Sequence, residues 1–518
     1  MKTKKLLSIC AFFISALFSI KAENSNVYGK SFFLGNGGEV TSNGLMHALG
    51  KHRDILEEKA NGNLSIHVEG GQTFKAQNIA QYFFFNNSDS MRVGQRATLI
   101  TNDIYSINLL LPQNTVSATD EQWQATIKAA PRLSTFTADF RGIFLLRGME
   151  KWYAEANLPV VHIKSNMRLS EQAGSQTITT IPAGYLDINA NGNLTAPYTS
   201  VIAALKGDKT IGDVTAKRQY GNIDGFRKKT VIGDVRLALG RRCIDEEQGY
   251  LALAFLGLIN GDDKSSSDVS YLGMPVVGTA GRNGVGIRCD GFYELYEHND
   301  KRFSVGLRAD IVHTFNAIIT RSYDASKHGI GSRYLLVKEF TSAFAYNNII
   351  KYLIDLSTLR AKINMAAVCD VSLMLRAQHK QIHCDLGLHI HAHTKETHKK
   401  WIDTGLPAGN YGALATAIAD CDDALVSQDV SITGAQINRL IPSTGATASA
   451  NTVLSINDLD KNSGLAPAAH SYRFFGNLGY SIDHRNDPYL LAGFSAECAN
   501  INAAPAQWGA YIAGGLHF

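Results

Sequence analysis

The sequence predicts an all-β fold, namely a membrane-spanning antiparallel up-and-down β-barrel of about 12 strands, or 14. Three observations lead to this prediction. Apolar and polar residues alternate over long stretches, the connections between these stretches are alternately short and long, and the chain begins with an export signal. Successive side chains of a strand point to opposite faces, so each alternating stretch forms a ribbon with one apolar and one polar face.

Residues 1–22 have the pattern of a secretory signal peptide. They carry lysines near the start, the apolar stretch LLSICAFFISALFSI and a small residue, Ala22, at the end. The apolar stretch is too short and wrongly flanked for a stable membrane anchor, so we expect cleavage after Ala22. Removing the four lysines of this segment brings the formal net charge from +4 to zero, which gives no reason to expect a nucleic-acid partner.

The N-terminal segment 23–62 is expected to plug the barrel or to lie in the periplasm, and residues 63–518 are expected to form the barrel with its loops. Within 63–518 we expect twelve ribbons: 63–75, 132–146, 157–168, 229–241, 248–260, 284–298, 302–315, 362–377, 380–394, 468–484, 488–500 and 506–518. Strands of soluble proteins average about five or six residues. Ribbons of this length suit tilted strands that cross a bilayer, which need roughly 9–11 residues.

The connections give an independent test of this prediction. If the C-terminus is periplasmic, the turns on the periplasmic side are short: 484–487, 377–380, 298–301 and 243–248. The outer connections are long, notably the loops 316–361 and 395–467, and only 500–505 is short. Outer-membrane barrels show this alternation. In the first loop, the apolar residues of 334–357 are spaced as a loose helical stripe, so we expect a helix there that folds inward or caps the barrel.

The polar faces of the ribbons are expected to line the lumen. Several ribbons carry an acid and a base two positions apart, and such charges on adjacent strands could neutralise one another. The expected lumen-lining residues are Asp234, Arg236, Arg288, Asp290, Arg308, Asp310, Asp370, Arg376, His383, Asp385 and Arg473.

Three further lumen positions are the histidines His389, His391 and His393. Alternate side chains share one face of a strand, and two imidazoles at this spacing are usable ligands for zinc, copper or nickel. Two other readings stay open, namely a lumen charge that changes near neutral pH and plain polar lining.

The sequence contains no G-x-S-x-G and no H-E-x-x-H motif, so we expect no enzyme activity. The glycine-rich stretch 278–286 lacks the flanking buried strand and helix of a phosphate loop. We therefore expect no cofactor.

The final residues, WGAYIAGGLHF, end in Phe518 with Leu516, Gly514 and Ile512 alternating behind it. This stretch resembles the C-terminal strand of bacterial outer-membrane β-barrel proteins of the porin-like kind. The resemblance implies a location in the bacterial outer membrane, contact with outer-membrane lipid, and recognition of Phe518 and Leu516 by the barrel-assembly machinery.

The first functional hypothesis is a pore through which small solutes diffuse passively, with selectivity set by the charged lumen. The alternatives are a plugged transporter of apolar compounds, with segment 23–62 as its hatch, and a surface-exposed adhesin or structural barrel. The sequence leaves open the solute, the oligomeric state and the pairing of the cysteines.

Overall fold

The computed structural model describes residues 26–518 except for a set of gaps. These gaps are residues 35–60, 95–102, 114–122, 147, 150, 175–176, 184, 188, 224, 247, 262–269, 327, 341–345, 408–409, 414–453 and 483–487. Among the described residues, no helix is long and apolar enough to cross a membrane.

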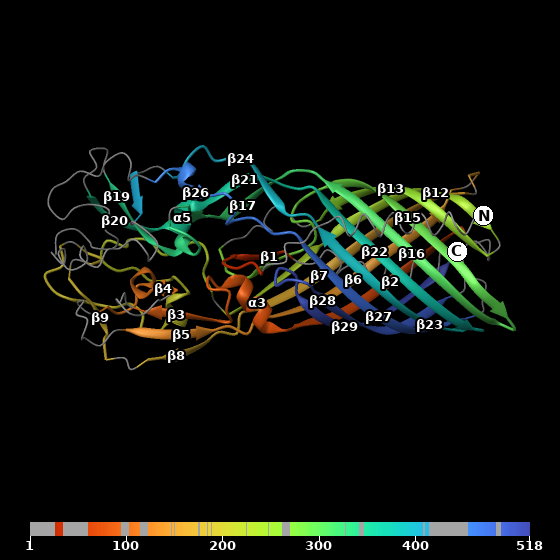
Figure 1. The fold of residues 1–518 in the computed structure, drawn as a ribbon, viewed down its shortest axis with the longest axis horizontal. Coiled ribbons are helices and arrows are strands. Elements are labelled where there is room, and N and C mark those ends of the chain that lie inside the picture. The colour runs from red at the N-terminus through yellow and green to blue at the C-terminus, as the bar shows by residue number, and fades with distance from the viewer. Residues whose placement is uncertain are drawn as a thin grey trace.

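The chain forms a closed antiparallel barrel of twelve strands, with a folded extension at one end (Figure 1). In order, the barrel strands are β2 (Gly62–Phe74), β6 (Arg132–Leu145), β7 (Trp152–Asn166), β12 (Asp234–Glu246), β13 (Gly249–Asn260), β15 (Gly284–His298), β16 (Lys301–Thr314), β22 (Ala367–His379), β23 (Ile382–His393), β27 (Ala469–Ser481), β28 (Tyr489–Ala499) and β29 (Ala506–His517). Each strand pairs with the next, and β29 pairs with β2 to close the ring. The predicted fold class is confirmed, including the strand number of about twelve.

A short strand, β11 (Phe226–Ile232), precedes β12 and extends its line. Strand β11 pairs with residues 160–166 of β7, whereas β12 pairs with residues 152–157 of β7. Gly233 separates the two strands and donates its backbone N–H to the carbonyl of Pro159 on β7 at 2.8 Å. Because proline has no N–H of its own, this position is where the ladder between β7 and its neighbour is interrupted.

The alternation of short and long connections is also observed. At the end that we call inner, the connections span only 146–151, 247–248, 299–300, 380–381 and 482–488. At the outer end the connections are long, except for 500–505. Phe518 lies at the inner end, where its backbone N–H donates to the carbonyl of Gly62 at 3.2 Å. The role of Phe518 and Leu516 in assembly stays a prediction.

The outward face of the barrel is apolar. Large apolar side chains on it are 41–66% exposed, including Ile66, Phe140, Leu158, Phe255, Ile287, Leu386, Phe474, Leu478, Leu490, Phe494 and Ile512. A soluble protein rarely exposes a continuous apolar surface of this extent to water, because its hydration is unfavourable. Aromatic residues lie near both ends, with Trp508 at the outer end and Tyr296 and Tyr480 at the inner end. This is the surface expected for contact with lipid tails and the two interfaces.

The outer connections form an extension with its own small sheets (Figure 1). One sheet contains β3 (Ser90–Gly94), β4 (Ile104–Tyr105), β5 (Gln124–Lys128) and β8 (Ser170–Ala173). A second contains β17 (Ala317–Ser322), β21 (Thr358–Met365) and β24 (Glu396–Trp401), and a third contains β19 (Leu336–Phe340), β20 (Tyr346–Tyr352) and β25 (Asn410–Ala413). Further pairs are β9 (Thr180–Ile181) with β10 (Leu194–Thr195), and β18 (Asp324–Ala325) with β26 (Leu459–Asp460). The described helices are short: α3 (Ala76–Phe83), α4 (Val201–Ala204) and α5 (Leu353–Ser357).

The helix expected over 334–357 was wrong for most of that stretch. Residues 336–340 and 346–352 form the paired strands β19 and β20, in which Leu336 pairs with Tyr352 and Lys338 with Ile350. Among the described residues after Tyr334 in this stretch, only those of α5 are helical. Val337, Ile350 and Tyr352 are β-branched or aromatic, and such residues fit a pleated sheet better than a helix. Pairing with β25, which is distant in the sequence, completes this sheet.

The described part of the N-terminal segment lies at the outer end of the barrel. Its strand β1 (Phe32–Leu34) pairs in parallel with β14 (Met274–Val276), which belongs to an outer connection. Residues 35–60, which include the helical-looking stretch LMHALGKHRDILEEKA, lie outside the described residues.

Candidate functional site

The lumen of the barrel is crossed by ion pairs. On β15 and β16, Arg288 lies opposite Asp310, and Asp290 lies opposite Arg308. The Nε–oxygen distances are 2.7 Å for Arg288 to Asp310 and 2.5 Å for Arg308 to Asp290. Neutralisation of charges between neighbouring strands was predicted from the sequence, and these two pairs are the clearest case.

Two residues of β7 extend this cluster across the lumen, because β7 is separated from β15 by β12 and β13 in the barrel order. The carboxylate of Glu155 lies 3.0 Å from Nη1 of Arg288 and 3.1 Å from Nη2 of Arg308. The hydroxyl of Tyr153 donates to Asp290 at 3.0 Å. These contacts join wall positions three and four strands apart, so side chains occupy this part of the lumen.

A second cluster centres on Asp370 of β22. Its carboxylate receives Nη2 of Arg236 at 2.6 Å and lies 2.7 Å from Nδ1 of His391 and 3.4 Å from Nε2 of His389. Arg236 also reaches Asp310 at 2.8 Å, which links this cluster to the first.

The three candidate metal ligands point inward but have protein partners. In addition to the Asp370 contacts, Nδ1 of His389 lies 2.6 Å from the hydroxyl of Ser372, and Nδ1 of His393 lies 3.2 Å from the carbonyl of Thr394. In the part of the chain that the structure describes, no group of three or more histidine, cysteine or carboxylate side chains is arranged to hold a metal ion. Metal binding by these histidines stays a prediction.

The remaining expected lumen residues also lie inside. Arg376 pairs with Asp385 at 2.8 Å, and the ring of His383 lies over Gly479 on the adjacent strand. Arg473 pairs with Glu497 at 2.8 Å. Asp234 lies at the outer end of β12, where it accepts the backbone N–H of Thr279 at 3.0 Å and the side-chain amide of Asn260 at 2.9 Å.

All eleven expected lumen-lining residues are only 0–7% exposed. Their charges therefore contact one another more than water, which differs from the wet lumen that the sequence analysis anticipated. Tyr153, Glu155 and Glu497 also belong to the network but were not predicted from the sequence. Glu155 lies between Ala154 and Ala156, so its strand lacks the strong contrast between faces that identified the other ribbons.

The inward face of β13 differs from the charged parts of the wall because its inward side chains from Tyr250 to Leu258 are all aliphatic or aromatic. Its inward side chains run from the inner to the outer end of the strand as Tyr250, Ala252, Ala254, Leu256 and Leu258, each at most 6% exposed. They belong to one apolar cluster that also includes Tyr153, Phe292 and Phe475. The uninterrupted apolar run from Tyr250 to Ile259 in the sequence was the available signal for this feature.

Aromatic rings fill the lumen where the neighbouring strand carries glycine. Tyr153 lies over Gly240, and Phe475 lies over Gly387, in each case as the directly paired residue of the adjacent strand. The same arrangement is found for Tyr511 over Gly493. A ring can lie flat against the wall only where the opposing residue has no Cβ, so these glycines are required by packing.

The outer mouth is closed by apolar packing around β1. Phe33 is 0% exposed and packs against Tyr82 and Phe83 of α3, with ring centroids 5.0 and 5.9 Å apart. It belongs to a large apolar cluster that combines residues of the extension with inward residues near the outer ends of β6 and β7, such as Leu133 and Val161. Strand β1 therefore occupies the entrance to the lumen.

Charged side chains lie on the other side of β1. The guanidinium of Arg321 lies 3.9 Å from the ring centroid of Phe32, and Arg321 and Arg282 approach Glu396 at 3.8 and 2.6 Å. Burial alone would raise the pKa of Glu396, but the charges of Arg282 and Arg321 outweigh burial and hold that pKa below its usual value.

Lys30, just before β1, donates its ammonium to the carbonyl of Ser463 at 2.8 Å and to the carbonyl of Asn462 at 3.1 Å. Burial lowers the pKa of Lys30 to about 8, and the positive charge of Arg333 acts in the same direction. Lys30 therefore loses its positive charge at a lower pH than an exposed lysine does.

The sequence matches no family model and no curated protein. Among solved structures, the chain is similar to an outer-membrane channel from Pseudomonas putida F1, with 9% identity over 88% of this chain and 96% of that chain and a TM-score of 0.35. It is also similar to the monoaromatic hydrocarbon channel CymD, with 9% identity over 89% of each chain and a TM-score of 0.28. The translocator domain of the autotransporter NalP from Neisseria meningitidis matches with 9% identity over 92% of this chain and 99% of that chain and a TM-score of 0.24. Identities and TM-scores this low carry no functional inference for this chain.

Proposed function

We propose that this chain is an outer-membrane transporter for small apolar compounds, and that the arrangement described above is its closed state. The observation that carries the proposal is the apolar inward face of β13, which runs the length of the strand from Leu258 to Tyr250 inside a lumen otherwise crossed by ion pairs. An apolar compound moving along this face stays in contact with apolar surface, whereas a hydrophilic solute gains nothing there.

The closed entrance favours this function over an open pore. Phe33 fills the apolar mouth and must move before a solute can enter. Below it, the contacts of Glu155 with Arg288 and Arg308 join strands three and four positions apart in the barrel and fill this part of the lumen. A passage therefore requires displacement of β1 and separation of these side chains, which corresponds to a plugged transporter. The adhesin or structural role of the outer loops stays a prediction.

Uptake of radiolabelled toluene, used as a small apolar probe, tests the proposal in cells that lack other routes for it. Cells that make the protein are expected to take up the probe faster than cells without it. Ala254→Trp puts a large ring onto the inward face of β13, so uptake is expected to fall to the level of cells without the protein. Leu253→Trp is the matched control, because Leu253 is the adjacent residue on the outward face and is 49% exposed.

Conductance in planar bilayers distinguishes a closed transporter of apolar compounds from a passive pore for hydrophilic solutes. The purified protein is expected to stay silent most of the time. Steady ohmic conductance together with equal uptake by the Ala254→Trp and Leu253→Trp variants would contradict the proposal and support a passive pore for hydrophilic solutes.

A further inference from the structure

The outward face of β6, β7 and β11 changes character towards the outer end. Across the three strands, the register aligns Ala138, Val160 and Ile232 in one row, and Phe136, His162 and Thr230 in the next row outward. The following rows are Ser134, Lys164 and Lys228, and finally Arg132, Asn166 and Phe226. The surface therefore passes from apolar to basic within about four residues of strand, or roughly 13 Å.

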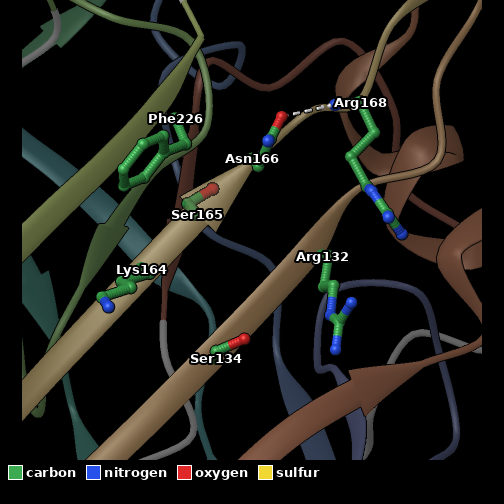
Figure 2. A pocket seen from close by; sticks show the side chains of 7 residues that line it. All are labelled: Arg132, Ser134, Lys164, Ser165, Asn166, Arg168 and Phe226. Carbon is green, nitrogen blue, oxygen red and sulfur yellow. Dashed lines mark hydrogen bonds between the residues drawn. The ribbon is translucent and has the colours of Figure 1, made fainter.

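Residues of these last two rows line a pocket of about 190 Å³ (Figure 2). Figure 2 shows Arg132 and Ser134 on one strand, Lys164 on the next, and Arg168 just beyond the end of that strand. The backbone N–H of Arg168 donates to the side chain of Asn166 at 2.8 Å, which holds the chain in a turn at the pocket rim.

The cations of this surface are exposed and have no carboxylate partner among the described residues. Arg132, Lys164, Arg168 and Lys228 are all exposed, and the side-chain contact of Arg132 is to the neutral amide of Gln72. In contrast, the lumen arginines are each matched with carboxylates. Four unmatched cations at one edge of the barrel raise the local potential and attract an anion.

The position of the pocket favours an anion that carries an apolar tail over a free anion. It lies directly above apolar outward side chains of the same strands, among them Phe136 at 52%, Phe140 at 46% and Ile232 at 43% exposed, and Phe226 at its rim is 57% exposed. An occupant that uses the whole surface has an anionic head at the height of the pocket and an apolar tail beside the barrel wall. A free anion would use only the upper half.

We propose that this surface binds a phosphate-bearing lipid of the outer leaflet. Arg132, Lys164 and Arg168 supply the positive charge for its phosphate, and its acyl chains lie along Phe136 and Phe140. In this structure Arg132 contacts Gln72, so its side chain turns towards the phosphate when the lipid binds. Arginine forms two parallel hydrogen bonds to a phosphate, while lysine supplies a point charge, so the two types of side chain act together. This site is separate from the lumen and does not depend on the transport function proposed above.

Each cation near an anionic lipid surface contributes about 1 kcal/mol, which corresponds to about a fivefold change in affinity. The Arg132→Gln/Lys164→Gln double variant is therefore expected to bind the lipid about 25-fold more weakly. Increasing the salt concentration from 0.1 M to 0.5 M is expected to weaken the wild type more than the double variant, because salt screens exposed charges.

Native mass spectrometry of the detergent-solubilised protein tests the proposal with three probes: diphosphoryl lipid A, its fully dephosphorylated form and inorganic phosphate. The wild type is expected to retain the phosphorylated lipid and to bind the dephosphorylated lipid and inorganic phosphate far more weakly. The Lys301→Gln/Lys380→Gln variant, which removes two exposed lysines at the inner end, is the matched control and is expected to bind as the wild type does.

Retention of the phosphorylated lipid by the Arg132→Gln/Lys164→Gln variant at the wild-type level would overturn the proposal. Equal binding of inorganic phosphate and lipid would also overturn it, because the site would then be an anion site without a lipid component. Thermal melting of both double variants shows whether each is folded. The single variant Arg132→Lys, which keeps the positive charge, is expected to retain most of the lipid binding of the wild type.

Discussion

Arg288 on β15 lies directly opposite Asp310 on β16, and the two side chains form parallel hydrogen bonds of 2.7 and 2.8 Å. Two residues along, the order of charges is reversed, with Asp290 opposite Arg308. A slip of the two strands by two residues would place Arg288 opposite Arg308, which is unfavourable inside the lumen. The reversed order of charge therefore favours the observed register in addition to neutralising the lumen.

The substitution Asp310→Asn is expected to destabilise the barrel by about 3–5 kcal/mol, because it removes a buried carboxylate that both Arg288 and Arg236 contact. Arg288 then keeps Glu155 as a buried carboxylate partner, and Arg236 keeps Asp370. Urea unfolding in phospholipid bilayers, followed by tryptophan fluorescence, measures this loss. Glu297→Gln on the same hairpin is the control. The pair of Glu297 with Arg302 is 53% and 37% exposed, and exposed pairs contribute about 0–1 kcal/mol. Equal losses for both variants would show that the lumen pairs are not energetically special.

The substitution Gly240→Ala is expected to destabilise the protein by about 1–3 kcal/mol, because its Cβ would overlap the side chain of Tyr153, to which the three nearest atoms all belong. The same substitution in a Tyr153→Val background is expected to be nearly neutral, so a double-mutant cycle measures the coupling. Gly257→Ala on the neighbouring strand is the control, since the nearest atom to its Cβ would be 3.8 Å away. Additive effects of the changes at 240 and 153 would contradict the packing described here.

The strands and their two faces could be predicted from the sequence because period two is a local property of the chain. The partners of the lumen side chains could not, because the period assigns Arg308 to the inside without showing which side chain of a distant strand it meets, and Glu155 lies outside the predicted ribbon 157–168. The apolar lining of β13 escaped notice since a strand that is apolar on both faces shows no alternation. The outer extension consists of strands as short as two residues, whose pairing partners are far away in the sequence. In the β19–β20 hairpin, apolar residues four apart gave a misleading helical spacing.

The substitution Phe255→Arg is expected to cost about 2–4 kcal/mol of barrel stability in bilayers, because Phe255 is 62% exposed on the outward face at the middle of β13. Tyr296→Arg, near the inner end of β15, is expected to cost only about 0–1 kcal/mol, because an arginine there reaches the interface. Unfolding in bilayers compares the two variants. A cost that does not depend on position would contradict contact of this face with lipid tails.

Docking of β1 at the mouth is expected to depend on pH through Lys30. Its pKa is about 8 in the docked state and about 10.5 for an exposed lysine, so the displaced state binds more protons between these values. Raising the pH through this window therefore favours docking, and opening becomes rarer by up to about tenfold per pH unit. Maleimide labelling of Ser31→Cys, whose native side chain is 2% exposed, reports opening. The ratio of this labelling rate to that of the Ser31→Cys/Lys30→Met double variant cancels the pH dependence of the thiol chemistry.

The charged groups around Lys30 decide whether this dependence belongs to it alone. The positive charge of Arg333 opposes the ammonium form of Lys30, while the charges of Asp324, Asp460 and Glu396 favour it. The ratio of the Ser31→Cys labelling rate to that of the Ser31→Cys/Lys30→Met variant is therefore expected to fall as the pH rises from about 8 to about 10.5. The control is the Ser31→Cys/Lys380→Met variant, which is changed at an exposed lysine of the inner end. Its labelling rate is expected to depend on pH as that of Ser31→Cys does. A flat ratio would mean that Lys30 keeps its charge state when β1 moves. In that case β1 would be held at the mouth by the packing of Phe33 without an electrostatic contribution from Lys30.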